Sequence, residues 1–340
     1  MIMTVDIGGT KTLCALWDKG RLIKKDIRQT SSIREPIEFL KGHAFLSDLG
    51  RDGSAGISVR ALCFALAGPI EEDNFKLTNT GQTLNFNEIR AAFPQIQRIA
   101  FLNDLEALAH GLSHLKQEDL QLFQIGAEEQ AANCHRQSAA SLNTAQSSTF
   151  RQNADKQGAK AVVSIGTGLG IAAITKEGIV IPSEGGHSDF APCDTMQHAL
   201  LRHLEKIYGH VSYERVLSGQ GIANIYNFLT ESPPMPPAKV TSKAFSGEKD
   251  ALDTFRIFTR ILAAACGNFA VTFKASGGIY LAGGVLPKIL PLLNRQCFEE
   301  AFRNKGRFGT WLTAIPVYAI MNELAPSLGA AVYGQKLLQD

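Results

Sequence analysis

Closely spaced cysteines, long apolar runs and an excess of one charge are all missing from this 340-residue sequence. Its six cysteines lie far apart and form no CxxC pair, which favours reduced, mostly structural thiols in a cytoplasmic protein. The longest apolar run, residues 261–273, falls short of the roughly 20 residues that a membrane-spanning helix needs. The chain enters an apolar strand at once, without a basic segment or a cleavage pattern, so we expect no secretion signal.

The charges are nearly balanced. A net charge of +2, from 34 basic and 32 acidic residues, gives no electrostatic reason to expect a nucleic-acid partner. With 45% hydrophobic and 19% charged residues, the composition is typical of a globular protein, and the length favours two domains. We therefore expect a soluble enzyme or binding protein.

An acid and a glycine turn follow the first apolar segment. Residues 2–7 predict a buried strand, and residues 12–17 predict a second one after the turn. We call residues 8–11 the first glycine turn; it is not a P-loop, which requires GxxxxGK[ST] followed by a helix. Asp6 is placed to face a Mg²⁺ ion or its waters while the turn receives phosphate. A purely structural turn is the alternative.

Another predicted strand ends in an amide and an acid. Residues 99–104 are apolar up to Asn103 and Asp104, and the leucine spacing that follows predicts a helix. Open α/β sheets place their ligands where the carboxyl end of a strand meets the start of a helix. Asn103 and Asp104 are therefore candidates for ligand binding, and helix capping is the alternative role.

The stretch 161–192 combines a phosphate-type turn with side chains that can bind hydroxyl groups. Two apolar strands flank residues 166–170, which we call the second glycine turn, and its backbone N–H groups can cradle phosphate oxygens. Glu184 and His187 follow, and they could hold a polyhydroxylated molecule. We expect a phosphate donor and a hydroxyl acceptor to meet here; a glycine-rich turn in an ordinary sheet is the alternative.

Three further segments have a distinctive composition or pattern of apolar residues. Residues 126–160 are polar and lack apolar periodicity, which predicts a mobile surface insertion. Residues 250–275 carry a helical apolar stripe and predict a long packed helix, and the strand after it closes on Gly283 and Gly284, which could approach a nucleotide. Residues 78–83 form a turn-rich segment, for which a surface connection is favoured over a cleft-lining loop.

Six segments, taken in order, resemble those of bacterial glucokinases along nearly the whole chain. They are DIGGT at 6–10, LND at 102–104, IGTGLG at 165–170, EGGH at 184–187, ERVLSG at 214–219 and LAGG at 281–284. The resemblance implies an α/β protein with the two-domain actin-like ATPase (ribonuclease H-like) fold and an interdomain cleft. It implies a small domain of residues 1–110 plus 325–340 and a large domain of residues 111–324 that carries the insertion at 126–160.

The resemblance also implies an activity, the Mg²⁺-dependent transfer of the γ-phosphoryl group of ATP to the 6-hydroxyl of glucose, the first step of glycolysis. Asp104 resembles the catalytic base of the family. The positions that resemble its sugar ligands are Asn103, Asp104, Glu184, His187 and Glu214. Those that resemble its nucleotide-binding positions are Asp6, Gly8, Gly9, Thr10, Lys11, Gly166, Thr167, Gly168, Gly283 and Gly284.

Three features depart from that pattern. Lys11 stands where these glucokinases usually have asparagine, residues 78–86 lack a tryptophan often found there, and the insertion is longer than expected. A wider related family carries a zinc site, but here only Cys193 lies near His187, so we expect no structural zinc and no metal site built by the protein. Glucose and ATP are the expected partners, and a homodimer is one option for the oligomeric state.

Other functions stay open at this point. A kinase of the same fold could act on another hexose or on an amino sugar, because the matched residues do not settle the stereochemistry at C2. A sugar-sensing regulator would carry a DNA-binding segment ahead of the first glycine turn, where only five residues precede Asp6. A non-catalytic nucleotide-binding scaffold would not need Asp104. The sequence leaves phosphoryl donors other than ATP, and any regulation, undecided.

Overall fold

A computed structural model describes residues 1–47, 58–68, 70, 72–76, 81, 83–124 and 158–339. Its contacts divide the chain into two compact units, Met1–Leu115 with Leu324–Asp340 (unit 1) and Lys116–Glu323 (unit 2). Nearly all of the predicted insertion at 126–160, and most of the predicted loop at 78–83, lie outside the described residues. Within the described part of the chain, no helix is long and apolar enough to cross a membrane.

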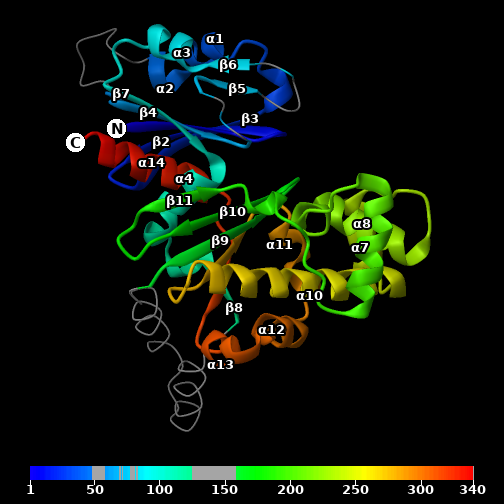
Figure 1. Cartoon of the computed structure of the whole chain (residues 1–340). Helices are drawn as coiled ribbons and strands as arrows, with labels where there is room; N and C mark the ends of the chain where they lie inside the picture. The colour runs from blue at the N-terminus through cyan, green and yellow to red at the C-terminus, as the bar shows by residue number, and fades with distance from the viewer. Residues whose placement is uncertain are drawn as a thin grey trace. The chain divides into compact units, whose positions relative to one another are not determined.

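Unit 1 is built on a five-stranded sheet of order β3-β2-β1-β4-β7 (Figure 1). Its strands are β1 (Ile2–Ile7), β2 (Lys11–Asp18), β3 (Arg21–Gln29), β4 (Ala61–Leu66) and β7 (Arg98–Asn103). The first three form an antiparallel meander, whereas β1, β4 and β7 run parallel. The strands predicted at 2–7, 12–17 and 99–104 are confirmed to within a residue or so at their ends.

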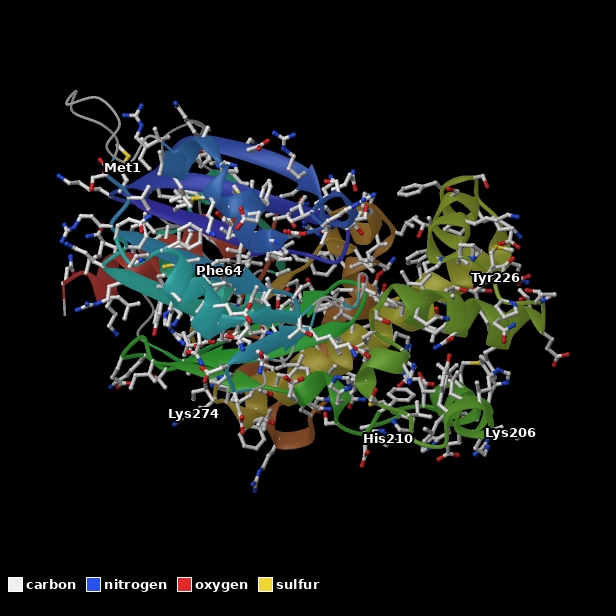
Figure 2. The ribbon with its side chains drawn as sticks, turned by 90° about the horizontal axis from the view of Figure 1, so that it is seen from above. Met1, Phe64, Lys206, His210, Tyr226 and Lys274 are labelled. Carbon is white, nitrogen blue, oxygen red and sulfur yellow. The ribbon has the colours of Figure 1, made fainter. Side chains whose placement is uncertain are left out.

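Helices cover both faces of this sheet. On one face lie α1 (Pro36–Lys41), α2 (Ala44–Ser47), the hairpin of β5 (Asn74–Lys76) and β6 (Thr83–Asn85), and α3 (Phe86–Ala92). Phe64 of β4, labelled in Figure 2, is fully buried there and its ring stacks on Phe101 at 4.9 Å between centroids. The other face packs against α4 (Asp104–Gly111) and α14 (Ala325–Leu337), which brings the C-terminal helix onto the N-terminal strands.

A buried polar cluster attaches α14 to the sheet. The indole Nε1 of Trp17 donates to Thr4 Oγ1 at 3.0 Å and to Ser327 Oγ at 3.2 Å, and the two hydroxyl oxygens lie 2.6 Å apart. All three residues are at most 4% exposed. The cluster therefore satisfies every one of these polar groups while joining β1, β2 and a helix more than 300 residues away.

Unit 2 repeats this strand arrangement in a six-stranded sheet of order β11-β10-β9-β12-β13-β8. Its strands are β8 (Leu120–Gln124), β9 (Lys160–Ile165), β10 (Leu169–Ile174), β11 (Val180–Ser183), β12 (Ile279–Ala282) and β13 (Val317–Ile320). As in unit 1, an antiparallel meander (β9, β10, β11) is followed by parallel strands (β9, β12, β13). The two glycine turns therefore occupy equivalent places, between the first and second strands of each meander.

The helices of unit 2 complete its core. They are α7 (Thr195–Tyr208), α8 (Gly219–Thr230), α9 (Pro237–Phe245), α10 (Lys249–Thr272), α11 (Leu286–Ile289), α12 (Arg295–Arg303) and α13 (Gly309–Leu312). The long helix predicted at 250–275 is confirmed as α10, whose apolar stripe is buried in the core of the unit. Capping side chains begin several of these helices; Asp194, for example, accepts the N–H of Gln197 at the start of α7 at 2.9 Å.

The backbones of α4 and α14 approach each other closely at two glycines. A Cβ at Gly329 would overlap the carbonyl oxygen of Ala107, and one at Gly111 would lie 2.8 Å from the Cα of Gly329. We predict that Gly329→Ala destabilises the protein by about 1–3 kcal/mol through overpacking, despite the better helix propensity of alanine. Urea unfolding measures the change.

Gly42→Ala is the matched control for this prediction. Gly42 has helical backbone angles, and a Cβ there would meet backbone oxygens no closer than 3.4 Å, which is ordinary contact. Its unfolding midpoint should stay close to that of the unchanged protein. Equal midpoints for Gly329→Ala and Gly42→Ala would show that the close approach of the two helices does not limit stability.

Candidate functional site

Two partly buried carboxylates lie at one edge of the unit 1 sheet. Because β1, β4 and β7 are parallel, Asp6 near the end of β1 and Asp104 just after β7 lie at the same edge. Burial raises the pKa of Asp104 to about 6, although a hydrogen bond from the Leu105 N–H acts to lower it. Burial, and secondarily the negative charge of Asp104, raise the pKa of Asp6 to about 7. The two acids are therefore electrostatically linked within unit 1.

Asn103 fixes the backbone at this edge. Its Oδ1 accepts the N–H of Leu105 at 2.9 Å, and its Nδ2 donates to the carbonyl of Gly68 at 2.8 Å. Asp104 Oδ1 also accepts the Leu105 N–H, at 2.9 Å. Asn103 and Asp104 thus cap α4, a role that does not exclude ligand binding, and Asn103 additionally ties the segment that follows β4 to the start of α4.

Two threonines from outside the predicted motif shape the first glycine turn. Thr30 Oγ1 donates to the carbonyl of Gly8 at 2.8 Å and lies 3.1 Å from Thr12 Oγ1, and the Thr30 N–H donates to the carbonyl of Thr10 at 2.9 Å. Thr12 and Thr30 are 2% and 3% exposed. Sequence reasoning did not find this pair, because Thr30 reaches the turn only through the pairing of β2 with β3.

The rest of the first glycine turn is open to a ligand. The Gly8 N–H closes the turn by donating to the carbonyl of Lys11 at 3.0 Å. Gly9, Thr10 and Lys11 are exposed. Three of the predicted nucleotide-binding positions of unit 1 are therefore accessible, while Asp6 and Gly8 are only partly so and the threonine pair is buried.

The second glycine turn is held by backbone bonds from two other segments. The Gly166 N–H donates to the carbonyl of Gly168 at 2.9 Å, and the Gly219 N–H at the start of α8 donates to the carbonyl of Gly166 at 3.0 Å. Gly283 has a φ of +97°, and a Cβ there would overlap the carbonyl of Ile165. The structure thus brings Gly283 against the second glycine turn, with Gly284 beside open space and Thr167 exposed.

The predicted sugar ligands of unit 2 are Glu184, His187 and Glu214. They come from two segments that meet at the start of β10. Glu214 Oε2 accepts the Leu169 N–H at 3.0 Å, and a Cβ at Gly186 would overlap the Leu169 carbonyl. The Tyr213 N–H donates to the carbonyl of Ser188 at 2.9 Å, which ties the two segments to each other. The Glu184 and His187 side chains are 73% and 61% exposed, with Oε2 and Nε2 3.9 Å apart.

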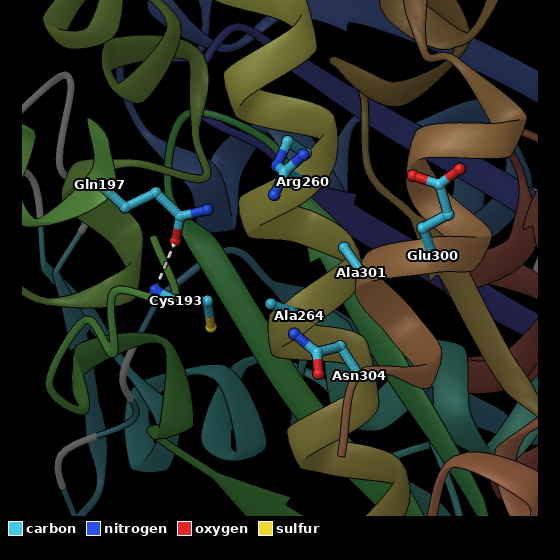
Figure 3. Close-up of a pocket in the computed structure, with 7 residues that line it drawn as sticks. All are labelled: Cys193, Gln197, Arg260, Ala264, Glu300, Ala301 and Asn304. Atoms are coloured by element: carbon cyan, nitrogen blue, oxygen red, sulfur yellow. Dashed lines mark hydrogen bonds between the residues drawn. The ribbon is translucent and has the colours of Figure 1, made fainter. Parts of the chain in front are cut away.

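A polar pocket elsewhere in unit 2 contains none of the predicted site residues. It has a volume of about 150 Å³ and lies between the start of α7 and the helices α10 and α12 (Figure 3). Gln197 Oε1 accepts the Cys193 N–H at 3.0 Å, and Arg260 Nη2 lies 3.2 Å from Asp194 Oδ2. Cys193, the thiol considered with His187 for zinc, lines this pocket.

Each unit thus carries a different set of groups that could take part in a reaction. Unit 1 presents a carboxylate whose pKa lies close to neutrality, at the same sheet edge as an exposed glycine turn, which suits proton acceptance beside a phosphate. Unit 2 presents a second such turn and a group of side chains that can accept and donate hydrogen bonds to hydroxyl groups.

Comparison with known proteins identifies the family. The glucokinase family model matches residues 3–337. The glucokinase of Neisseria meningitidis serogroup C is 30% identical over 342 aligned positions, which cover 97% of this chain and 93% of that protein. The crystal structure of a glucokinase from an Antarctic psychrotroph is 26% identical, covers 98% of both chains and gives a TM-score of 0.80.

A more distant likeness extends the comparison of folds. A ROK family glucokinase from Streptomyces griseus, solved in complex with glucose and AMPPNP, shares 17% identity over 98% of this chain and 99% of that chain, with a TM-score of 0.57. These neighbours have the actin-like ATPase fold, which confirms the fold class predicted from the sequence. With its family model matched from residue 3 to residue 337, the chain belongs to the glucokinase family.

Proposed function

We propose that this protein transfers the γ-phosphoryl group of ATP to the 6-hydroxyl of glucose, giving glucose 6-phosphate and ADP. Membership of the glucokinase family supports the proposal, as does the Streptomyces griseus neighbour with glucose and AMPPNP bound. The observation on which it mainly rests is the buried Asp104 carboxylate at the junction of β7 and α4, with its pKa raised to about 6.

Asp104 is the proposed catalytic base. Phosphoryl transfer depends on positioning and charge stabilisation, with a carboxylate near the attacking hydroxyl as its main protein group. Asp104 Oδ1 is engaged by the Leu105 N–H, which orients the carboxylate and leaves its second oxygen for a sugar hydroxyl. A pKa near 6 keeps the group ionised at neutral pH and yet basic enough to accept a proton.

The two glycine turns are the proposed phosphate sites. Gly8, Gly9, Thr10 and Lys11 are the proposed positions in unit 1, where the lysine ammonium would pair with a phosphate, and Thr30 would hold the first turn in shape. The proposed positions in unit 2 are Gly166, Thr167, Gly168, Gly283 and Gly284. Nothing in this assignment requires a helix after the turn, because the N–H groups come from a strand hairpin.

Mg²⁺ is proposed to arrive with ATP. Its fit to unit 1 rests on Asp6, whose pKa is raised to about 7 by burial and by Asp104, so a cation would relieve an unfavourable pairing of charges. Among the described residues, no three acidic, cysteine or histidine side chains are grouped as a metal site, which suits an ion that keeps water and phosphate ligands. Asp6 would hold the ion through its water ligands. When bound, the ion neutralises charge on the transferred phosphoryl group.

Glucose is proposed to bind through Asn103, Glu184, His187 and Glu214, together with Asp104. Carboxylate, amide and imidazole groups can each satisfy a hydroxyl that both donates and accepts. In a desolvated site, a sugar that lacks a matching hydroxyl leaves its protein partner unpaired, which makes such a site selective. The alternative is a kinase for another hexose or an amino sugar. A sensor or a scaffold is less favoured, because neither requires Asp104. The cytoplasmic location and the homodimer stay predictions.

The substrate assignment predicts a clear order of preference among hexoses. With ATP as donor, kcat/KM for glucose should exceed that for mannose, fructose and glucosamine by more than tenfold, because each of these alters a group near C2 that the proposed ligands would bind. A coupled assay of ADP release measures it. A higher kcat/KM for any other sugar of the panel would reassign the substrate.

The base assignment predicts loss of turnover without loss of the sugar site. Asp104→Asn keeps an acceptor for the Leu105 N–H but cannot take a proton, so kcat should fall by at least about 100-fold. Glucose affinity, measured by calorimetry, should change only a few-fold. The control is Asp18→Asn, an exposed acid at the end of β2 that should behave as the unchanged protein. A kcat within tenfold of normal in Asp104→Asn would contradict the assignment.

The raised pKa of Asp104 predicts opposite effects of pH on rate and stability. The value of kcat/KM should rise between pH 5 and 7 with a midpoint near 6, as the base becomes ionised. Because the pKa in the folded protein lies above the ordinary aspartate value of 3.8, the stability contribution of this group is complete below about pH 4 and is lost as the pH rises through 6.

Asp104→Asn is therefore expected to melt higher than the unchanged protein at pH 7.5, and to lose that advantage at pH 4.5. Removal of the Asp104 charge also lowers the pKa of Asp6, which acts in the same direction. Thermal unfolding at the two pH values measures the difference. If the melting temperatures of Asp104→Asn and the unchanged protein differ by the same amount at both pH values, the ionised Asp104 side chain does not destabilise the folded protein.

A further inference from the structure

The Glu214 carboxylate links the proposed phosphate turn of unit 2 to the proposed sugar site. Glu214 lies in a short 3-10 helix (Tyr213–Arg215), and its Oε2 accepts the N–H of Leu169, the residue at which the second glycine turn enters β10. The proposed phosphate turn and a proposed sugar ligand thus share one hydrogen bond of 3.0 Å.

Gly168 makes room for this carboxylate. A Cβ at position 168 would overlap Glu214 Oε2 and lie 3.3 Å from its Cδ, and no other heavy atom comes within 4 Å. The backbone of Gly168 is outside the left-handed region, so an alanine could adopt its conformation. The need for glycine at this position comes from the Glu214 side chain and not from the turn itself.

The backbone around Glu214 is fixed, so that only its side chain can move. Ser218 Oγ donates to the Glu214 carbonyl at 2.8 Å, and the Tyr213 N–H donates to the Ser188 carbonyl at 2.9 Å. Ser218 is fully buried, while Glu214 itself is half-buried. A side chain added at position 168 would therefore push the carboxylate aside and leave the surrounding segment in place.

The second carboxylate oxygen of Glu214, Oε1, is available to a ligand. Within the described part of the chain, no hydrogen bond to Oε1 is found, whereas Oε2 is engaged by Leu169. A carboxylate held at one oxygen presents the other in a set direction. A sugar hydroxyl bound at Oε1 would in turn restrict the side chain and so steady the bond from Oε2 to the turn, which lowers the ordering cost of binding the second substrate.

We propose that Gly168 is a positioning residue that sets the Glu214 carboxylate between sugar and nucleotide. Oε1 receives a sugar hydroxyl while Oε2 braces the second glycine turn, so each substrate strengthens the binding of the other. The inference rests on the proposed function and deepens it: it assigns the glycine at 168 a role in sugar binding, and it assigns the Leu169 N–H the role of link between the two substrates.

The test compares glucose affinity, measured by calorimetry with and without AMPPNP, in the unchanged protein, three single variants and one double variant. Gly168→Ala should weaken glucose binding by roughly tenfold or more, the usual size for a lost hydrogen bond to a charged group. It should also abolish the gain in glucose affinity that AMPPNP gives the unchanged protein. Its melting temperature should stay close to normal, since the atom displaced is the end of a flexible side chain.

Gly42→Ala is the control, because Gly42 lies in unit 1 and outside every proposed binding position. A Cβ there would meet backbone oxygens no closer than 3.4 Å, so glucose affinity should not change, with or without AMPPNP. The third variant, Glu214→Ala, closes a double-mutant cycle: once the carboxylate is gone, adding Gly168→Ala should cost no further glucose affinity.

Two results would overturn the inference. One is a Gly168→Ala variant with normal glucose affinity, and the other is a full additional loss in the Glu214→Ala background, which would show that Gly168 acts by another route. Both leave the proposed function standing as long as the unchanged protein phosphorylates glucose. If the unchanged protein neither binds nor phosphorylates glucose, the proposed function itself fails.

Discussion

Close approach of backbone segments is the constraint on which this molecule depends. Backbone excludes a side chain at Gly329 against α4, at Gly283 against Ile165 and at Gly186 against Leu169, among other places, and the Glu214 side chain does so at Gly168. The first of these joins the terminal helix to α4. The other three surround the second glycine turn and the start of β10. The same device therefore serves stability in one unit and the construction of a site in the other.

The repeated strand arrangement explains why two glycine turns exist. In each unit an antiparallel meander leads into parallel strands, and the turn lies between the first two strands of the meander. Parallel strands bring their carboxyl ends to one edge, and in unit 1 that edge carries Asp6 and Asp104. Burying both acids there is unfavourable for folding, since each pKa is raised. Such a cost is expected at a site whose chemistry needs a poorly solvated carboxylate.

Local patterns predicted the local features well. Apolar runs marked the buried strands of both sheets, and the apolar stripe marked α10, because burial on one or both faces leaves a direct trace in sequence. The sequence also predicted the position of Asp104 at the end of a strand. The contacts that hold the site were not: Thr30 reaches Gly8 only through strand pairing, and Trp17 meets Ser327 from the opposite end of the chain. Hydrogen bonds between distant segments have no local signature.

The central claim is that Asp104 takes the proton of the sugar hydroxyl that attacks ATP. A crystal structure of this chain with glucose and a non-hydrolysable ATP analogue tests it most directly. We expect the 6-hydroxyl of glucose within hydrogen-bond distance of the Asp104 carboxylate, about 2.6–3.2 Å, with the phosphates of the analogue at the two glycine turns. A 6-hydroxyl bonded to another group, with Asp104 facing neither sugar nor phosphate, would contradict it.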